Sequence, residues 1–143
     1  MQPLKDYSFI RGVCHNPKHN GNQETLEREL SFCRRLNLNS IRFWMSQEAY
    51  ERDSDGYLQF IGNFIRTCGQ YEITCMPILW NGNFITEFQT PSDEEYKQAA
   101  AYAEAVINAF KGEENLLMWD IMNEPMCNDF LHKAPGEEYN DRF

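Results

Sequence analysis

The sequence predicts an α/β fold in which a parallel sheet is built from strands that alternate with helices. Short apolar runs of strand-like composition alternate with longer runs whose apolar residues recur at helical spacing. The strand-like runs start about 30 to 45 residues apart, which leaves room for a crossover helix between successive parallel strands. This alternation suits an open doubly wound sheet or a closed barrel of eight such units, and it does not by itself separate the two.

Four segments are the expected strands. They are residues 9–14, 40–44, 73–80 and 116–122. Each is rich in β-branched, aromatic or other apolar residues. Pro77 cannot donate a backbone hydrogen bond, so we expect it near the carboxyl end of the third strand. Asp120 lies within the fourth strand, and the sequence assigns it no role.

Three helices are expected between these strands. The first spans about residues 23–36, with apolar residues at helical spacing. The second follows residue 56 and ends near Gly69, a residue that commonly terminates helices. The third begins at Ser92, and Glu95 three residues later completes a capping-box pattern.

Net charge and hydropathy exclude some classes of partner. A formal net charge of −9 at pH 7 argues against nucleic acids and anionic membrane surfaces, which attract basic proteins. No apolar run is long enough to span a bilayer. Residues 1–7 lack the apolar stretch of a signal peptide, so a secreted or periplasmic location would require that a leader had been removed. Neutral ligands such as sugars are compatible with this composition.

The cysteines suggest neither a disulfide framework nor a zinc site. Their number is odd, and no CxxC pair occurs among Cys14, Cys33, Cys68, Cys75 and Cys127. We expect them to be small buried hydrophobic residues. No metal or organic cofactor is expected.

The loop after the first strand argues against nucleotide binding. Residues 12–21 contain neither GxGxxG nor GxxxxGK[ST], the patterns that place a glycine-rich turn against phosphates. The nucleotide-binding open-sheet folds therefore lose their main support.

Polar and aromatic residues gather where the expected strands end. They are His15, Asn16, Arg42, Trp44, Trp80, Asn81, Asn123 and Glu124. Barrel enzymes place their catalytic groups at the carboxyl ends of the strands, so these positions are the candidate site.

Residues 119–125 read Trp-Asp-Ile-Met-Asn-Glu-Pro. This segment resembles the fourth-strand motif of clan A glycoside hydrolases, especially family 5 (cellulases, mannanases and relatives) and, more loosely, family 2. Residues 11–13, 41–44 and 76–79 also look similar to the first three strands of that family. The resemblance implies that residues 1–143 are a partial catalytic domain, the N-terminal half of a (β/α)₈ TIM barrel.

The family resemblance also implies a reaction, namely retaining hydrolysis of a β-linked oligo- or polysaccharide in carbohydrate metabolism. Glu124 corresponds to the general acid/base, and Asn123 to the Asn that binds the sugar 2-hydroxyl. Arg42 corresponds to the Arg that supports a nucleophilic Glu at the end of strand seven, which this chain does not contain. Many family members carry a His just after strand three, where residues 80–84 read Trp-Asn-Gly-Asn-Phe.

The chemistry supports this assignment independently of the family. Glycoside cleavage requires an acid that protonates the leaving oxygen and a second carboxylate that traps or stabilises the oxocarbenium-like centre. Glu124 follows an apolar strand and is the candidate acid, although a Glu at a strand end is often only a surface residue. Arg42 lies in an apolar run, and a buried Arg requires an anionic partner, either catalytic or structural.

The remaining candidates are substrate-binding residues. His15, Trp44, Trp80 and Asn81 line the expected cleft, and the two indole rings suit stacking on sugar faces. Packing against the core explains the two Trp residues equally well, and a structural role explains His15 equally well.

Two other functions remain open on the sequence. A carbohydrate-binding pseudoenzyme would keep the cleft and lose the chemistry. A different α/β enzyme would use a complete open sheet, and strand order in a structure would distinguish it. If the chain is half a barrel, unpaired sheet edges and an exposed apolar face predict that residues 1–143 alone are poorly stable, self-associating and inactive.

Overall fold

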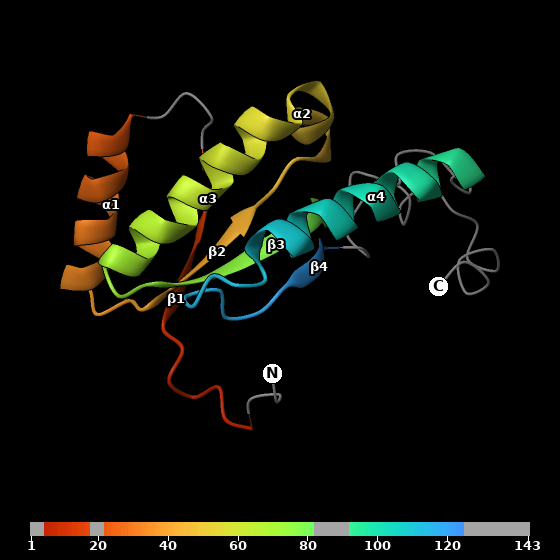
Figure 1. Ribbon diagram of the computed structural model, residues 1–143. Helices are drawn as coiled ribbons and strands as arrows, with labels where there is room; N and C mark the ends of the chain where they lie inside the picture. Colours follow the sequence, from red (N-terminus) through yellow and green to blue (C-terminus); the bar gives the residue numbers. More distant parts are fainter. Residues whose placement is uncertain (1–4, 18–21, 82–91, 125–143) are drawn as a thin grey trace.

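The computed structural model describes residues 5–17, 22–81 and 92–124 (Figure 1). Strands and helices alternate along the chain, with one additional short helix. In order they are β1 (Gly12–His15), α1 (Gln23–Arg35), β2 (Ser40–Trp44), α2 (Gln47–Arg52), α3 (Ser54–Gln70), β3 (Thr74–Asn81), α4 (Asp93–Phe110) and β4 (Asp120–Asn123).

The strands form one parallel sheet in the order β1-β2-β3-β4. Spatial order therefore equals chain order, and every crossover steps in the same direction. A doubly wound sheet reverses direction at a switch point, whereas a (β/α) barrel does not. The fold is part of a (β/α) barrel, which confirms the predicted fold class.

One face of the sheet is covered by helices. Figure 1 shows α1, α3 and α4 on the same side of the strands. Ile41 and Phe43 of β2 are buried there, in one cluster with Ile61 and Ile65 of α3 and with Val106 of α4. Burial of side chains of this size contributes about 1.5–3 kcal/mol each, so this interface holds the described elements together.

The opposite face carries Arg42. Cys14, Arg42 and Met76 are register partners on three neighbouring strands, so they share this face. In a closed barrel it is the interior.

This placement corrects one expectation for the cysteines. Cys14 is exposed, because it lies on an edge strand and shares the face that carries Arg42. Cys68 and Cys75 are buried as expected, and Cys33 is half-buried. Cys127 lies outside the described residues.

The helix starts follow local capping chemistry. Ser92 and Glu95 form the expected capping box at α4, with each side chain accepting from the other's backbone N–H. The side chain of Asn22 caps α1, and that of Asp53 caps α3.

Helix α2 was not expected from the sequence. It has six residues and none of them is buried, so it has no apolar periodicity to detect. Ser46 caps the start of this helix, because its hydroxyl oxygen accepts a hydrogen bond from the N–H of Ala49.

Pro77 explains why β4 is shorter than expected. Pro77 lies inside β3, opposite Phe43 of β2, and not near the carboxyl end of the strand. Cys75 forms an isolated β-bridge with Leu116 in the segment before β4. Its N–H donates to the carbonyl of Asn115, and its C=O accepts from the N–H of Leu117. Pro77 has no N–H to continue this ladder, and pairing resumes only at Ile78 with Asp120.

Candidate active site

Four polar side chains from three strands meet at the carboxyl end of the sheet. They are Arg42 of β2, Asn81 of β3, and Asp120 and Asn123 of β4, which we call the Arg42 cluster. The parallel register brings the ends of these strands to one edge, where Asn81 is the partner of Asn123. Residues up to 81 positions apart in the chain are thereby joined by hydrogen bonds.

Asp120 is the anionic partner that Arg42 requires. Both Nε and Nη2 of Arg42 lie 2.8 Å from Oδ2 of Asp120. The two side chains are 27% and 22% exposed, so the pair is partly shielded from water. Burial opposes the charge of Arg42, but the hydrogen bonds and charge of Asp120, together with Cys14, raise the pKa of the guanidinium above its usual value. Arg42 is therefore a permanent cation.

Arg42 also holds Asn123. Nη1 of Arg42 donates to Oδ1 of Asn123 at 3.0 Å, and Nδ2 of Asn123 donates to Oδ1 of Asn81 at 2.9 Å. Asn123 is only 8% exposed. Its amide is thus bonded at both ends, and its rotation would break two hydrogen bonds in a shielded position.

Glu124 follows directly after this cluster. Its φ is 47°, in the left-handed region that non-glycine residues rarely occupy. Strained backbone of this kind costs about 1–3 kcal/mol. Asn37 and Glu72, in the turns before β2 and β3, also have a positive φ. The side chain is exposed, and none of the described residues bonds to its carboxylate. Glu124 is thus an exposed carboxylate at the end of β4.

Trp44 lies beside the Arg42 cluster. The guanidinium of Arg42 is 5.7 Å from the centre of the Trp44 ring, within range of a cation–π contact. Trp44 also lines a cavity of about 450 Å³, whose wall includes Asn16 and Asn81. The structure therefore brings Trp44, Asn81 and Asn16 to one hollow.

Trp80 is held by the helices. Its Nε1 donates to Oε1 of Gln47 in α2 at 2.9 Å, and its ring meets Tyr102 of α4 edge-on at 6.0 Å between centroids. These contacts match the packing alternative for this residue.

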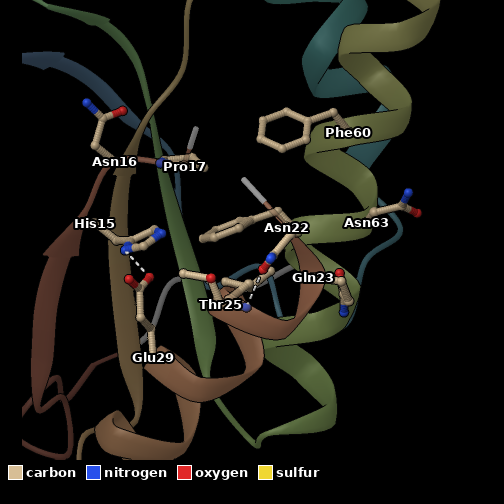
Figure 2. Close-up of a pocket in the computed structure, with 11 residues that line it drawn as sticks. His15, Asn16, Pro17, Asn22, Gln23, Thr25, Glu29, Phe60 and Asn63 are labelled. Carbon is tan, nitrogen blue, oxygen red and sulfur yellow. Dashed lines mark hydrogen bonds and ion pairs between the residues drawn. The ribbon is translucent and has the colours of Figure 1, made fainter. Parts of the chain in front are cut away.

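His15 does not join the Arg42 cluster. His15 lines a cavity of about 360 Å³ that adjoins the hollow at Trp44 and shares Asn16, Pro17 and Phe60 with it. Figure 2 shows its ring directed toward Glu29. The ring stacks on Phe64 of α3 at 5.4 Å, and Nδ1 lies 3.8 Å from the Glu29 carboxylate. Burial lowers the pKa of His15 and outweighs the opposing charge of Glu29.

Two residues of this region were not singled out from the sequence, namely Asp120 and Gln47. The signal for Asp120 was indirect, because an Arg in an apolar strand calls for a carboxylate nearby. No described residues form a group of three or more His, Cys, Asp or Glu able to hold a metal ion. The helices among the described residues are also too short or too polar to cross a membrane.

The strand order defines the class, a (β/α) barrel of which four consecutive strands are described, with the polar cluster at their carboxyl ends. Residues 5–142 match the family described as Cellulase (glycosyl hydrolase family 5). The chain belongs to glycosyl hydrolase family 5, which confirms the predicted family.

Solved structures support the fold. The endo-1,4-beta-mannanase of Rhizomucor miehei is 18% identical with a TM-score of 0.68, and the match covers 85% of this chain and 46% of that one. The endo-beta-1,4-mannanase of Thermotoga petrophila is 16% identical with a TM-score of 0.60, covering 80% and 34%. The beta-mannanase of the blue mussel Mytilus edulis is 24% identical with a TM-score of 0.52, covering 72% and 34%.

The chain thus spans less than half the length of these three structures. A comparison with curated proteins gave no match.

Proposed function

We propose that this chain forms part of the catalytic domain of a retaining β-glycoside hydrolase, with Glu124 as the general acid/base. The observation that carries the proposal is the position of Glu124. It follows β4 at a strained φ, directly beside an amide held on both sides. Membership of glycosyl hydrolase family 5 supports the reaction class, and the endo-1,4-mannanases among the similar structures support a β-1,4-linked polysaccharide as substrate.

In the proposed mechanism the two carboxyl groups act together in each of two steps. Glu124 protonates the oxygen of the leaving sugar while a second carboxylate attacks the anomeric carbon and forms a glycosyl-enzyme ester. Glu124, now ionised, then removes a proton from water as the water attacks the same carbon and displaces that carboxylate. The second carboxylate belongs to a part of the barrel beyond the fourth strand.

Arg42 is equipped to support that second carboxylate. A guanidinium has five N–H donors, and the contacts to Asp120 and Asn123 use one each on Nε, Nη1 and Nη2. That leaves two N–H groups on the terminal nitrogens, and the Cys14 thiol also hydrogen-bonds the guanidinium, so one N–H remains for another acceptor. The cation therefore serves Asp120 and a nucleophile together in this proposal, and Asn123 contacts the sugar 2-hydroxyl with its remaining amide hydrogen.

Trp44 and Asn81 are the substrate-binding candidates that the geometry favours, since both line the hollow beside the Arg42 cluster. Trp80 stays a candidate platform with its indole N–H already bonded to Gln47. His15 lines the adjoining cavity and pairs with Glu29, away from the Arg42 cluster, so it has less support as a substrate ligand.

Replacing Glu124 with Gln in the protein at its native length tests the proposal. The amide keeps the shape and removes the transferable proton, so kcat/KM on β-linked polysaccharides should fall about 10²-fold or more. Substrate affinity, measured by calorimetry, should change little. Glu113→Gln is the control, since it removes a carboxylate that pairs with Arg66, outside the Arg42 cluster. Unchanged turnover in Glu124→Gln, or saccharide binding without turnover in the native protein, would contradict the proposal.

A further inference from the structure

We infer that Asp120 is a positioning residue, which acts through Arg42 to hold the amide of Asn123 in the orientation that meets the sugar. This inference rests on the proposed function, because it assigns Asn123 to the substrate. The role is one of orientation, and Asp120 itself contacts neither the sugar nor the reacting atoms.

The first step of the argument is the geometry of the ion pair. Two different nitrogens of Arg42 converge on one oxygen of Asp120, each at 2.8 Å. A guanidinium is planar, so contacts through Nε and Nη2 fix both the position and the plane of the group. The third nitrogen, Nη1, is then directed at Asn123.

The second step is the direction in which Asn123 is turned. An Asn side chain has an acceptor end and a donor end, and either could face a neighbour. The cation fixes Oδ1 toward Arg42, and Asn81 accepts from Nδ2 on the other side. The donor end of Asn123 is therefore presented at the carboxyl edge of the sheet, one residue before Glu124.

The third step excludes a purely local explanation. Asp120 and Asn123 both lie on β4, but no hydrogen bond joins them, and the coupling runs through Arg42 of β2. Loss of the Asp120 charge would leave Arg42 partly shielded without its anion, which favours a different guanidinium position. Asn123 would lose its fixed acceptor contact even though its own strand is unchanged.

A comparison of two substrates separates this role from general support of the fold. The probes are an aryl β-glycoside and its 2-deoxy analogue, which is one compound for gluco- and manno-configured sugars. The kcat/KM of the parent glycoside divided by that of the 2-deoxy analogue reports the contact to the 2-hydroxyl. Asn123→Ala should lower this ratio about 10-fold or more. Asp120→Asn should lower it by most of the same factor, and the double variant should lower it no further.

The controls make each outcome decisive. Glu113 pairs with Arg66, and its side chain is 22% exposed, the same fraction as that of Asp120. Glu113→Gln breaks this pair and should leave the ratio unchanged. If Asp120→Asn fails to fold, Arg42→Lys replaces it, because a lysine ammonium keeps the charge but cannot hold Asp120 and Asn123 in one plane. That variant should lower the ratio in the same way.

The inference is overturned if Asp120→Asn lowers kcat/KM equally for both probes, or if its effect on the ratio multiplies with that of Asn123→Ala. Neither result affects Glu124. Conversely, full turnover in Glu124→Gln would remove the proposed function and leave the Asp120–Arg42–Asn123 coupling measurable by crystallography of Asp120→Asn.

Discussion

At the scale of single residues, three members of the Arg42 cluster were singled out from the sequence, but the hydrogen bonds that connect them were not. The residue types at the strand ends pointed to Arg42, Asn81 and Asn123 individually. Their connection through Asp120 depends on the register of the strands. Arg42 is opposite Met76 and Asp120 is opposite Ile78, so Asp120 lies two positions further along the sheet than Arg42. Strand register is set by tertiary packing and was not available from the sequence.

His15 gives a residue-scale prediction about pH. Its pKa in the folded state is lowered from 6.5 by burial, so the unfolded chain binds the proton more tightly. Stability should therefore be independent of His15 above about pH 7 and fall as the pH drops through 6.5 toward the folded pKa. His15→Phe keeps a ring against Phe64 and removes the titration.

Denaturant unfolding of both proteins between about pH 5 and 7.5 checks this. The free energy of unfolding of His15→Phe should rise relative to that of the parent as the pH falls. A constant difference in the free energy of unfolding would show that burial of His15 does not oppose its protonation.

At the scale of elements, prediction succeeded wherever local chemistry determines the outcome. The strand at residues 40–44 and the capped start of α4 were both predicted correctly, because apolar alternation and capping are local signals. Helix α2 and the late start of β4 were not predicted. The first has no buried face, and the second depends on the partner strand, where Pro77 interrupts the ladder.

The capping box of α4 gives an element-scale prediction. Ser92→Ala removes the side-chain acceptor for Glu95 N–H and the partner of the Glu95 carboxylate. The free energy of unfolding should fall by about 1 kcal/mol. Ser31→Ala is the comparison, because Ser31 lies inside α1 and bonds only a carbonyl of its own helix. Equal effects of the two substitutions would mean that the cap contributes nothing specific.

At the scale of the whole molecule, the strand order is the most informative feature. It places the described elements as consecutive units of a barrel and puts Arg42, Asn123 and Glu124 at its carboxyl end. β1 and β4 have no second neighbour among the described strands, and Val13 and Ile121 on these edges are 39% and 60% exposed. Such edges favour pairing with other chains.

This leads to a prediction for the isolated polypeptide of residues 1–143. It should self-associate, because β1 and β4 are open edges of the described sheet. It should show no hydrolysis, because the proposed mechanism takes its second carboxylate from beyond the fourth strand. Light scattering after size-exclusion chromatography, with an assay on β-linked polysaccharides, provides the check. A stable, active monomer would refute the half-barrel account.

The role of Glu124 is tested most directly by the dependence of Glu124→Ala on the leaving group. A general acid matters most for a poor leaving group and least for one that departs without a proton. The account predicts that Glu124→Ala loses about 10²-fold or more in kcat/KM on a β-linked disaccharide but little on a dinitrophenyl β-glycoside. Added azide should then yield a β-glycosyl azide, since the glycosyl-enzyme no longer has its base. Equal losses on both substrates, with no azide product, would contradict the assignment of Glu124 as the acid/base.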